Sequence, residues 1–215
     1  MTDHNRRNLI LGLGGALLTG RAMSASLVPT PRQSAGPFYP AEIPLDDDND
    51  LTQVIGRPGR ASGVISDVEG RILDVNGNPL RNLRIEIWQC DANGRYRHPG
   101  DAGGKPIDEN FQGHGTNVSN DKGQYRFRTI KPVPYPGRTP HIHVAVFAPG
   151  ERPFVTQLYV AGEPANDDDF LYRRIPTDKR ALVTTPFTPS TGTGAELTAR
   201  FDIILDRRDG TPADA

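Results

Sequence analysis

The chain has 215 residues, which favours one domain, and its 23 glycines and 20 prolines make up one residue in five. Only 35% of the residues are hydrophobic, which excludes a polytopic membrane protein and argues against a long helical bundle. The net charge of −1 gives no basic field that would attract nucleic acid, and the single cysteine, Cys90, excludes a disulfide framework. The composition favours a loop-rich β domain.

Residues 1–25 have the order of a secretory signal. Arg6 and Arg7 precede an apolar run over 9–18, and small residues follow. The run holds about ten residues, too few to cross a hydrocarbon core of roughly 30 Å. The paired arginines are similar to a twin-arginine signal, which implies export of a folded protein to the periplasm and no membrane attachment after cleavage. The alternative is a frayed tail with a chance arginine pair.

A series of short strands is predicted over 60–206, between an irregular, proline-rich N-terminal arm over 26–59 and a polar tail over 207–215. The strands are expected where β-branched or alternating runs are separated by turn-forming residues. These runs are 62–65, 71–75, 83–88, 125–129, 141–147, 155–160 and 200–205. No long stretch keeps the apolar period of a helix. The pattern predicts an all-β fold, an antiparallel β-sandwich with long loops and an N-terminal arm.

His141 and His143 lie on one face of a predicted strand, because side chains two residues apart point the same way. Such a pair can bind one metal ion, although a polar strand face explains it more often. The carboxylate that completes the usual iron or zinc site is missing nearby. Tyr135, flanked by prolines, and Tyr96 are further candidates, since a trivalent ion such as Fe(III) can deprotonate a coordinated phenol. Taken singly, each tyrosine fits an ordinary core or surface position.

Five sequence segments then stand in a specific order: IEIWQ at 85–89, NGRYRH at 93–98, GQYRFRTIKP at 123–132, PYP at 134–136 and RTPHIH at 138–143. This series resembles the intradiol ring-cleavage dioxygenases, most closely the β-chain type of protocatechuate 3,4-dioxygenase. The similarity covers roughly 34–205, nearly all of the chain after the signal.

The resemblance implies a non-haem Fe(III), an Fe(3+) cofactor, held by two tyrosines and two histidines that match Tyr96, Tyr135, His141 and His143. It implies that a catechol-type aromatic substrate binds through both oxygens and displaces Tyr135. Reaction with O2 then opens the ring between the two hydroxyls and gives a cis,cis-muconate-type product. Such a reaction belongs to aromatic compound catabolism, and protocatechuate is one substrate of this kind.

The resemblance also implies roles around the iron. Arg138 matches an arginine beside a developing carbanion, whose charge a fixed guanidinium can stabilise; a surface salt bridge is the alternative. Gln157 matches a glutamine that faces substrate or O2, although a sheet hydrogen bond would also explain it. Gly36 and Pro37 match a segment that lines the substrate mouth. Trp88 matches an aromatic residue near the ligand-bearing loop, and core packing could be its whole role.

The segment between Tyr135 and His141 departs from the family pattern. It is shorter than in protocatechuate enzymes, and Gly137 stands where a tryptophan usually follows, so the identity of the catechol stays open. Those enzymes pair two homologous chains, so a homologous partner chain or a homo-oligomer remains an option here.

Two other functions fit parts of the sequence. A non-catalytic, transthyretin-like β-sandwich binding module fits the turns over 70–83, but it has no reason to keep two tyrosines and two histidines in family order. A zinc hydrolase built on His141 and His143 lacks a third ligand and a general base. The intradiol dioxygenase is therefore the favoured hypothesis.

Overall fold

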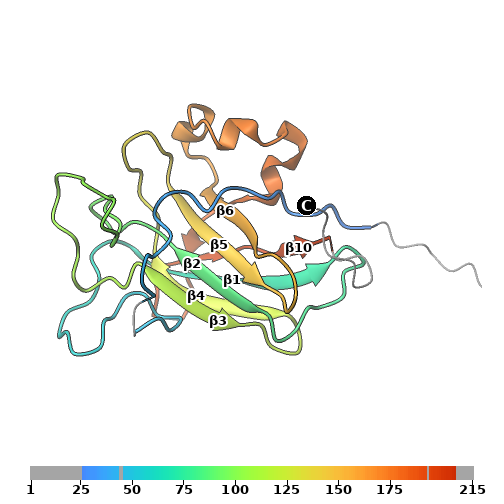
Figure 1. The fold of residues 1–215 in the computed structure, drawn as a ribbon, viewed down its shortest axis with the longest axis horizontal. Coiled ribbons are helices and arrows are strands. Elements are labelled where there is room, and N and C mark those ends of the chain that lie inside the picture. The colour runs from blue at the N-terminus through green and yellow to red at the C-terminus, as the bar shows by residue number, and fades with distance from the viewer. Residues whose placement is uncertain (1–25, 44–45, 193, 207–215) are drawn as a thin grey trace, which may run out of the picture.

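The computed structural model describes residues 26–43, 46–192 and 194–206, which form a sandwich with loops gathered at one end (Figure 1). The predicted signal and tail lie outside the described residues, and the domain boundaries proposed from the sequence stay predictions. Among the residues that are described, no helix is both long enough and apolar enough to span a membrane.

The described part contains strands and three short 3-10 helices. The strands are β1 (Ile65–Asp74), β2 (Arg84–Trp88), β3 (His114–Val118), β4 (Gln124–Ile130), β5 (His141–Phe147), β6 (Phe154–Val160), β7 (Thr184–Thr185), β8 (Thr188–Pro189), β9 (Leu197–Arg200) and β10 (Ile203–Leu205). The 3-10 helices are η1 (Pro164–Asp167), η2 (Tyr172–Arg174) and η3 (Thr177–Leu182).

Two sheets make the sandwich, and the all-β prediction is confirmed. One sheet has the order β3-β2-β5-β6-β7; in the other, β1 pairs with β4 on one side and with β9 and β10 on the other. Most neighbouring strands are antiparallel, as predicted, while β1–β9, β1–β10 and β6–β7 are parallel. The parallel pairs all involve the late, short strands, which return to the sheets after long connections.

The core fills the space between the sheets because each strand presents every second side chain inward. From β2, β5 and β6 it receives Ile85, Ile87, Ile142, Val144, Val146, Phe154 and Leu158, and from the facing sheet Val68, Ile72, Phe127 and Ile203. The opposite face of β5 is also buried along most of its length. That second face carries His141 and His143, and loops and the N-terminal arm cover it.

The strand prediction needs correction near Gly70. The runs 62–65 and 71–75 were expected as separate strands, but β1 is continuous through Gly70. A Cβ on Gly70 would lie 1.8 Å from the Phe201 carbonyl oxygen, so this glycine permits close strand approach and does not mark a turn. The run 200–205 is split into β9 and β10, and β3 was not predicted because its sequence, HGTNV, has little apolar alternation.

The N-terminal arm runs along the edge of the sandwich towards the loop-rich end (Figure 1). The backbone N–H of Thr30 donates to the Ile204 carbonyl at 3.0 Å, and that of Gln33 donates to the Val155 carbonyl at 2.8 Å. The arm therefore reaches the start of β5, where the loops after β2 and β4 also meet.

Candidate active site

The register of the β3-β2-β5-β6 sheet places four side chains in one row across its outer face. His114 of β3 pairs with Trp88 of β2. Trp88 pairs with His143 of β5, and His143 pairs with Gln157 of β6. Directly paired residues share a face, so the core-facing isoleucines and valines of these strands set the position of the row. The indole of Trp88 stacks on His143, with ring centroids 4.8 Å apart and an interplanar angle of 4°.

The two histidines of β5 converge as the period of two predicts. His141 Nε2 lies 3.2 Å from His143 Nε2, and both residues are at most 2% exposed. His141 Nδ1 lies 2.7 Å from the Thr139 carbonyl oxygen, so a proton on Nδ1 leaves a lone pair on Nε2. Burial lowers the pKa of His141 to about 3 and the pKa of His143 well below its usual range, so both imidazoles are neutral. Two neutral nitrogens therefore face one point.

Tyr135 reaches the same point from a tight turn. In the segment Tyr135–Pro136–Gly137–Arg138, the Arg138 N–H donates to the Tyr135 carbonyl at 2.9 Å, and Gly137 has φ +82°. A type II turn requires a positive φ at its third residue, which glycine provides, and often has proline second. Gly137, at the position where the family pattern has a tryptophan, thus makes the short connection to β5 possible.

Tyr96 enters from the loop after β2, which folds around an aspartate. Asp91 Oδ1 accepts the backbone N–H groups of Asn93 and Arg95, at 2.8 and 3.0 Å, and Gly94 has φ +76°. Asp101 Oδ2 accepts the Tyr96 N–H at 2.7 Å. The contact between Asp91 and Asn93 is an Asx turn, which fixes a loop locally, and the Asp101 contact adds to it. The Tyr96 ring is only 3% exposed.

The four rings form one group. Tyr96 and Tyr135 have centroids 5.4 Å apart, Tyr135 and His141 5.5 Å, and Tyr96 and His143 6.3 Å. Burial raises the pKa of Tyr96 well above its usual range, and burial also raises that of Tyr135 despite the opposing charge of Arg138. Without a metal ion both phenols therefore stay protonated at neutral pH.

This group fits a trivalent metal ion. Two nitrogens that each bind one ion at about 2.1 Å, at a right angle, lie about 3 Å apart, close to the observed separation of the imidazole nitrogens. Within the described residues the Tyr96 hydroxyl is buried and has no hydrogen-bond partner. Both features suit direct ligands of a shared ion, and the positive charge of that ion would favour the phenolates.

A conventional carboxylate or thiolate site is not seen in the described part of the chain, where no three His, Cys, Asp or Glu side chains cluster suitably for a metal. Cys90 is buried next to the site, and burial, with Asp91 nearby, raises the pKa of its thiol to about 12. This weighs against the zinc-hydrolase alternative.

Arg138 lies beside the four rings and is not a surface residue. Its side chain is 6% exposed; Nε donates to Asp169 Oδ2 at 2.7 Å, and Nη2 donates to Gln157 Oε1 at 2.5 Å. Nη1 lies 3.5 Å from the Tyr135 hydroxyl. Burial opposes the charge, but the hydrogen bond and charge of Asp169 outweigh it and raise the pKa of Arg138. The structure thus brings a fixed cation and Gln157 next to Tyr135.

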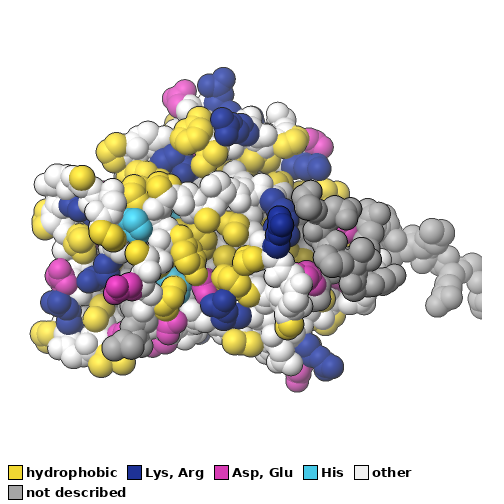
Figure 2. Space-filling model, viewed as in Figure 1, with side chains coloured by type: hydrophobic (Ala, Val, Ile, Leu, Met, Phe, Trp, Pro, Cys, Tyr) yellow, Lys and Arg dark blue, Asp and Glu magenta, His cyan; other side chains and the backbone are white. Residues whose placement is uncertain are grey.

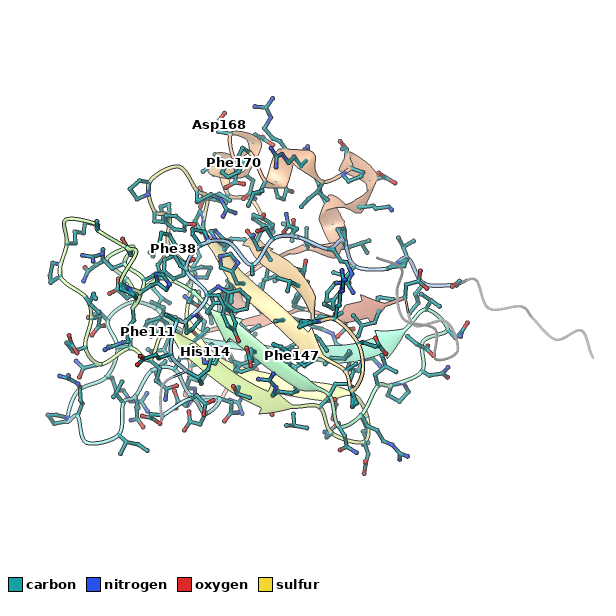
Figure 3. The ribbon with its side chains drawn as sticks, in the orientation of Figure 1. Phe38, Phe111, His114, Phe147, Asp168 and Phe170 are labelled. Atoms are coloured by element: carbon teal, nitrogen blue, oxygen red, sulfur yellow. The ribbon has the colours of Figure 1, made fainter. Side chains whose placement is uncertain are left out.

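The arm supplies the remaining predicted residues. A Cβ on Gly36 would lie 3.3 Å from His143 Cε1, so the arm backbone touches this imidazole. Pro37 is exposed in the turn that follows. Phe38 stacks on Tyr96, with centroids 4.8 Å apart and an interplanar angle of 27°, at the loop-rich end of the sheet (Figure 3). Hydrophobic side chains with histidine among them gather on this face of the molecule (Figure 2).

Sequence reasoning gave no role to several neighbours of the site. Asp169 is 2% exposed and accepts a hydrogen bond from Arg138. The Tyr159 hydroxyl donates a hydrogen bond to Gln157 Oε1 at 3.1 Å, and the Phe38 ring stacks on Tyr96. All three lie in segments that match the family, 34–39, 156–159 and 169–173, and this match was the available signal. None of the three carries a local motif that predicts its contact.

Comparison with known proteins decides the family. A dioxygenase family model matches residues 34–207. The chain belongs to the intradiol dioxygenases. Among named relatives, the protocatechuate 3,4-dioxygenase β chain of Burkholderia cepacia is 39% identical over 191 residues, which cover 84% of this chain and 81% of the relative. A hydroxyquinol 1,2-dioxygenase of Corynebacterium glutamicum is 32% identical, over 79% of this chain and 61% of the relative.

Solved structures of intradiol dioxygenases share the fold. The dioxygenase domain of a carbohydrate-binding fusion protein from Streptomyces sp. SirexAA-E is 30% identical with a TM-score of 0.62, and the match covers 83% of this chain and 99% of that domain. Catechol 1,2-dioxygenase from Acinetobacter sp. ADP1 is 26% identical with a TM-score of 0.61, and the match covers 86% of this chain and 67% of that one. The chain thus spans most of the β-chain relative but only part of the longer catechol and hydroxyquinol enzymes.

Proposed function

We propose that this intradiol dioxygenase uses Fe(III) and O2 to open a catechol-type ring between its two hydroxyls, giving a cis,cis-muconate-type product. The observation that carries the proposal is the convergence of Tyr96, Tyr135, His141 and His143 on one buried point. The names of the relatives, which are protocatechuate, hydroxyquinol and catechol dioxygenases, support a catechol-type substrate.

These four side chains would hold the iron. When bound, Fe(III) supplies a Lewis acid that favours the phenolate and catecholate forms and prepares the ring for attack by O2. The protein contributes neutral imidazoles and two phenols whose raised pKa keeps them protonated unless a metal ion binds. The ligand set is therefore suited to a trivalent ion more than to a divalent one.

The two tyrosines have different freedom to move. Tyr96 is packed under Phe38, whereas Tyr135 is partly exposed in a turn whose two central residues, Pro136 and Gly137, are exposed. Tyr135 is thus the phenolate that can swing away when substrate enters, and its Oη can accept one hydroxyl proton of the catechol.

Arg138 is placed for the charge that develops on the substrate. Its guanidinium is held on two sides by Asp169 and Gln157, and Nη1 points to the position that Tyr135 vacates. A cation fixed before reaction stabilises negative charge on the ring without reorganisation. Gln157 is itself fixed, because its Nε2 donates to the Ser34 carbonyl at 3.2 Å.

Iron content and colour test the proposal. Purified protein is expected to hold about one Fe per chain and to be wine-red, from charge transfer between tyrosinate and iron. Tyr96→Phe should bleach or shift this band and weaken iron binding, whereas Tyr125→Phe, at a tyrosine outside the ring group, should not. A colourless protein that holds no iron after reconstitution would favour the non-catalytic binding module. A panel of catechols with product analysis then identifies the substrate.

All four candidate ligands come from one chain, which supports the further proposal that the iron site needs no second chain. The protein expressed alone should bind iron and turn over a catechol, as a homo-oligomer or a monomer by native mass spectrometry. Iron binding that requires a co-expressed homologous chain would contradict this.

We also propose that the chain acts in the periplasm after export through its paired arginines and cleavage near residue 25. Replacing Arg6 and Arg7 together by lysine should remove the protein from the periplasmic fraction. Arg21→Lys, the same change outside the pair, is the control. Unchanged export of the double variant would rule out the twin-arginine route.

A further inference from the structure

A buried polar cluster lies on the other side of Trp88 from His143. Glu86 of β2 and His114 of β3 are each 1% exposed. Glu86 Oε2 accepts the Tyr39 hydroxyl at 2.8 Å and lies 3.4 Å from His114 Nε2, while the guanidinium of Arg84 pairs with Oε1. The proposed reaction uses none of these groups. A buried charge without a role in the chemistry calls for another explanation.

Glu86 is held as a carboxylate. Burial alone would raise its pKa, but the nearby His114 imidazole, the hydrogen bond from Tyr39 and the charge of Arg84 outweigh burial and lower it. The pKa of Tyr39 is raised to about 12, by burial first and then by its bond to Glu86. Tyr39 therefore remains a hydrogen-bond donor to an ionised acceptor at neutral pH, which is the stronger kind of hydrogen bond.

The cluster binds the downstream end of the arm segment that covers the four candidate ligand rings. Tyr39 also sets its ring edge-on to Trp88, at 5.0 Å and 88°. One residue earlier, Phe38 stacks on Tyr96, and Gly36 touches His143. Upstream, the Ser34 carbonyl accepts a hydrogen bond from Gln157 Nε2. The segment 34–39 is thus fixed at both ends, and Tyr39–Glu86 is its downstream fixing point.

We propose that the Tyr39–Glu86 hydrogen bond, with His114 and Arg84 holding Glu86 in place, anchors residues 34–39 closed over the candidate iron centre. Tyr39, Glu86 and His114 are then positioning residues that act through Gly36 and Phe38 on His143 and Tyr96. The anchor itself is independent of the reaction, whereas its effect on iron rests on the proposed function.

Amide hydrogen exchange of the metal-free protein tests the anchor. Tyr39→Phe removes one hydroxyl and keeps the ring against Trp88. Loss of a hydrogen bond to a charged group should raise exchange in the peptide 31–41, which contains the bonded amides of Gln33 and Gly36, roughly 10- to 100-fold. Peptides from β4 should not change. Tyr125→Phe, which removes the buried hydroxyl that donates to the Phe201 carbonyl, is the matched control and should leave 31–41 unchanged.

Two exchange results would overturn the anchor: unchanged exchange over 31–41 in Tyr39→Phe, or an equal rise in Tyr125→Phe. The effect on the metal has its own measurement, transfer of Fe(III) from the loaded protein to a chelator. Tyr39→Phe should release iron several-fold faster than the unmodified protein and Tyr125→Phe. Faster exchange with unchanged iron release would refute the action on the iron centre. Failure of every variant to bind iron would refute the proposed function and leave the exchange result standing.

Discussion

Arg138 Nε donates a hydrogen bond of 2.7 Å to Asp169 Oδ2. The same oxygen accepts the backbone N–H of Thr139 at 3.0 Å, and the Thr139 carbonyl in turn contacts His141 Nδ1. Asp169 Oδ1 accepts two more backbone N–H groups, from Leu171 and Tyr172. One buried carboxylate therefore positions both the site cation and a candidate metal ligand.

Asp169→Asn should lower kcat about 10- to 100-fold, the usual effect of losing a partner that orients ligands, with a smaller change in KM. The amide keeps the shape but removes the charge that balances Arg138. Asp168→Asn makes the same change at the adjacent exposed position (Figure 3) and should be neutral. Steady-state kinetics of both variants with equal iron content check this, and an unaltered kcat for Asp169→Asn would count against the positioning role.

Arg138→Lys should lower kcat by about 10², while iron binding and colour are retained. Lysine keeps the charge but cannot reach Asp169, Gln157 and the Tyr135 hydroxyl from one planar group. Arg174→Lys, in η2, is the control. A lysine variant with normal kcat would show that charge alone suffices and that the fixed geometry does not matter.

Gly36→Ala should weaken iron retention about tenfold, because the new methyl group meets His143 Cε1 at 3.3 Å. Gly36 has φ +70°, so the variant also carries the strain of a left-handed alanine, about 1 kcal/mol. Gly150→Ala has the same strain, at φ +77°, with open space around the methyl group. Chelator competition on both variants separates the contact with His143 from the backbone strain. Equal iron retention in the two variants would show that the contact between the arm and His143 does not affect iron binding.

The metal-free protein should lose stability when the pH falls from 6.5 to 5. Unfolded histidine has a pKa of about 6.5, and folded His141 and His143 lie far lower, so within this window only the unfolded chain takes up these protons. Each such histidine contributes up to about 1.4 kcal/mol per pH unit, and stability is fully present only above pH 6.5. Urea denaturation at each pH measures this. His141→Asn should flatten the slope, and an unchanged slope would contradict the assignment.

Local rules predicted the parts of the site that depend on neighbours in sequence. The period of two placed His141 and His143 on one face, and the prolines on both sides of Tyr135 indicated a rigid turn that presents it. The short alternating runs between turn-forming residues also predicted the β-sandwich. These features are set by a few adjacent residues, so a single sequence contains them.

Long-range packing produced what the sequence did not predict. Asp169 meets Thr139 across thirty residues, and Tyr39 meets Glu86 across forty-seven. Neither pair has a periodicity or a turn signature, because the contact depends on where whole loops dock. Tyr96 was a candidate for the chemistry of its phenol, but only the family resemblance joined it to His141 and His143, because no spacing in the sequence links them. His114 lies in a strand that lacks apolar alternation, so its place beside Glu86 could not be foreseen.

Metal uptake reports whether the strands have paired in the correct register. The reason is the row across the sheet that is formed by His114, Trp88, His143 and Gln157. A one-residue slip of β6 against β5 would turn Gln157 into the core and leave Arg138 without its second partner. A slip of β2 would remove the indole from His143. Iron would therefore be retained by chains whose strands are in register and lost by those whose strands are not, so the colour of a preparation would report the fraction that has folded correctly.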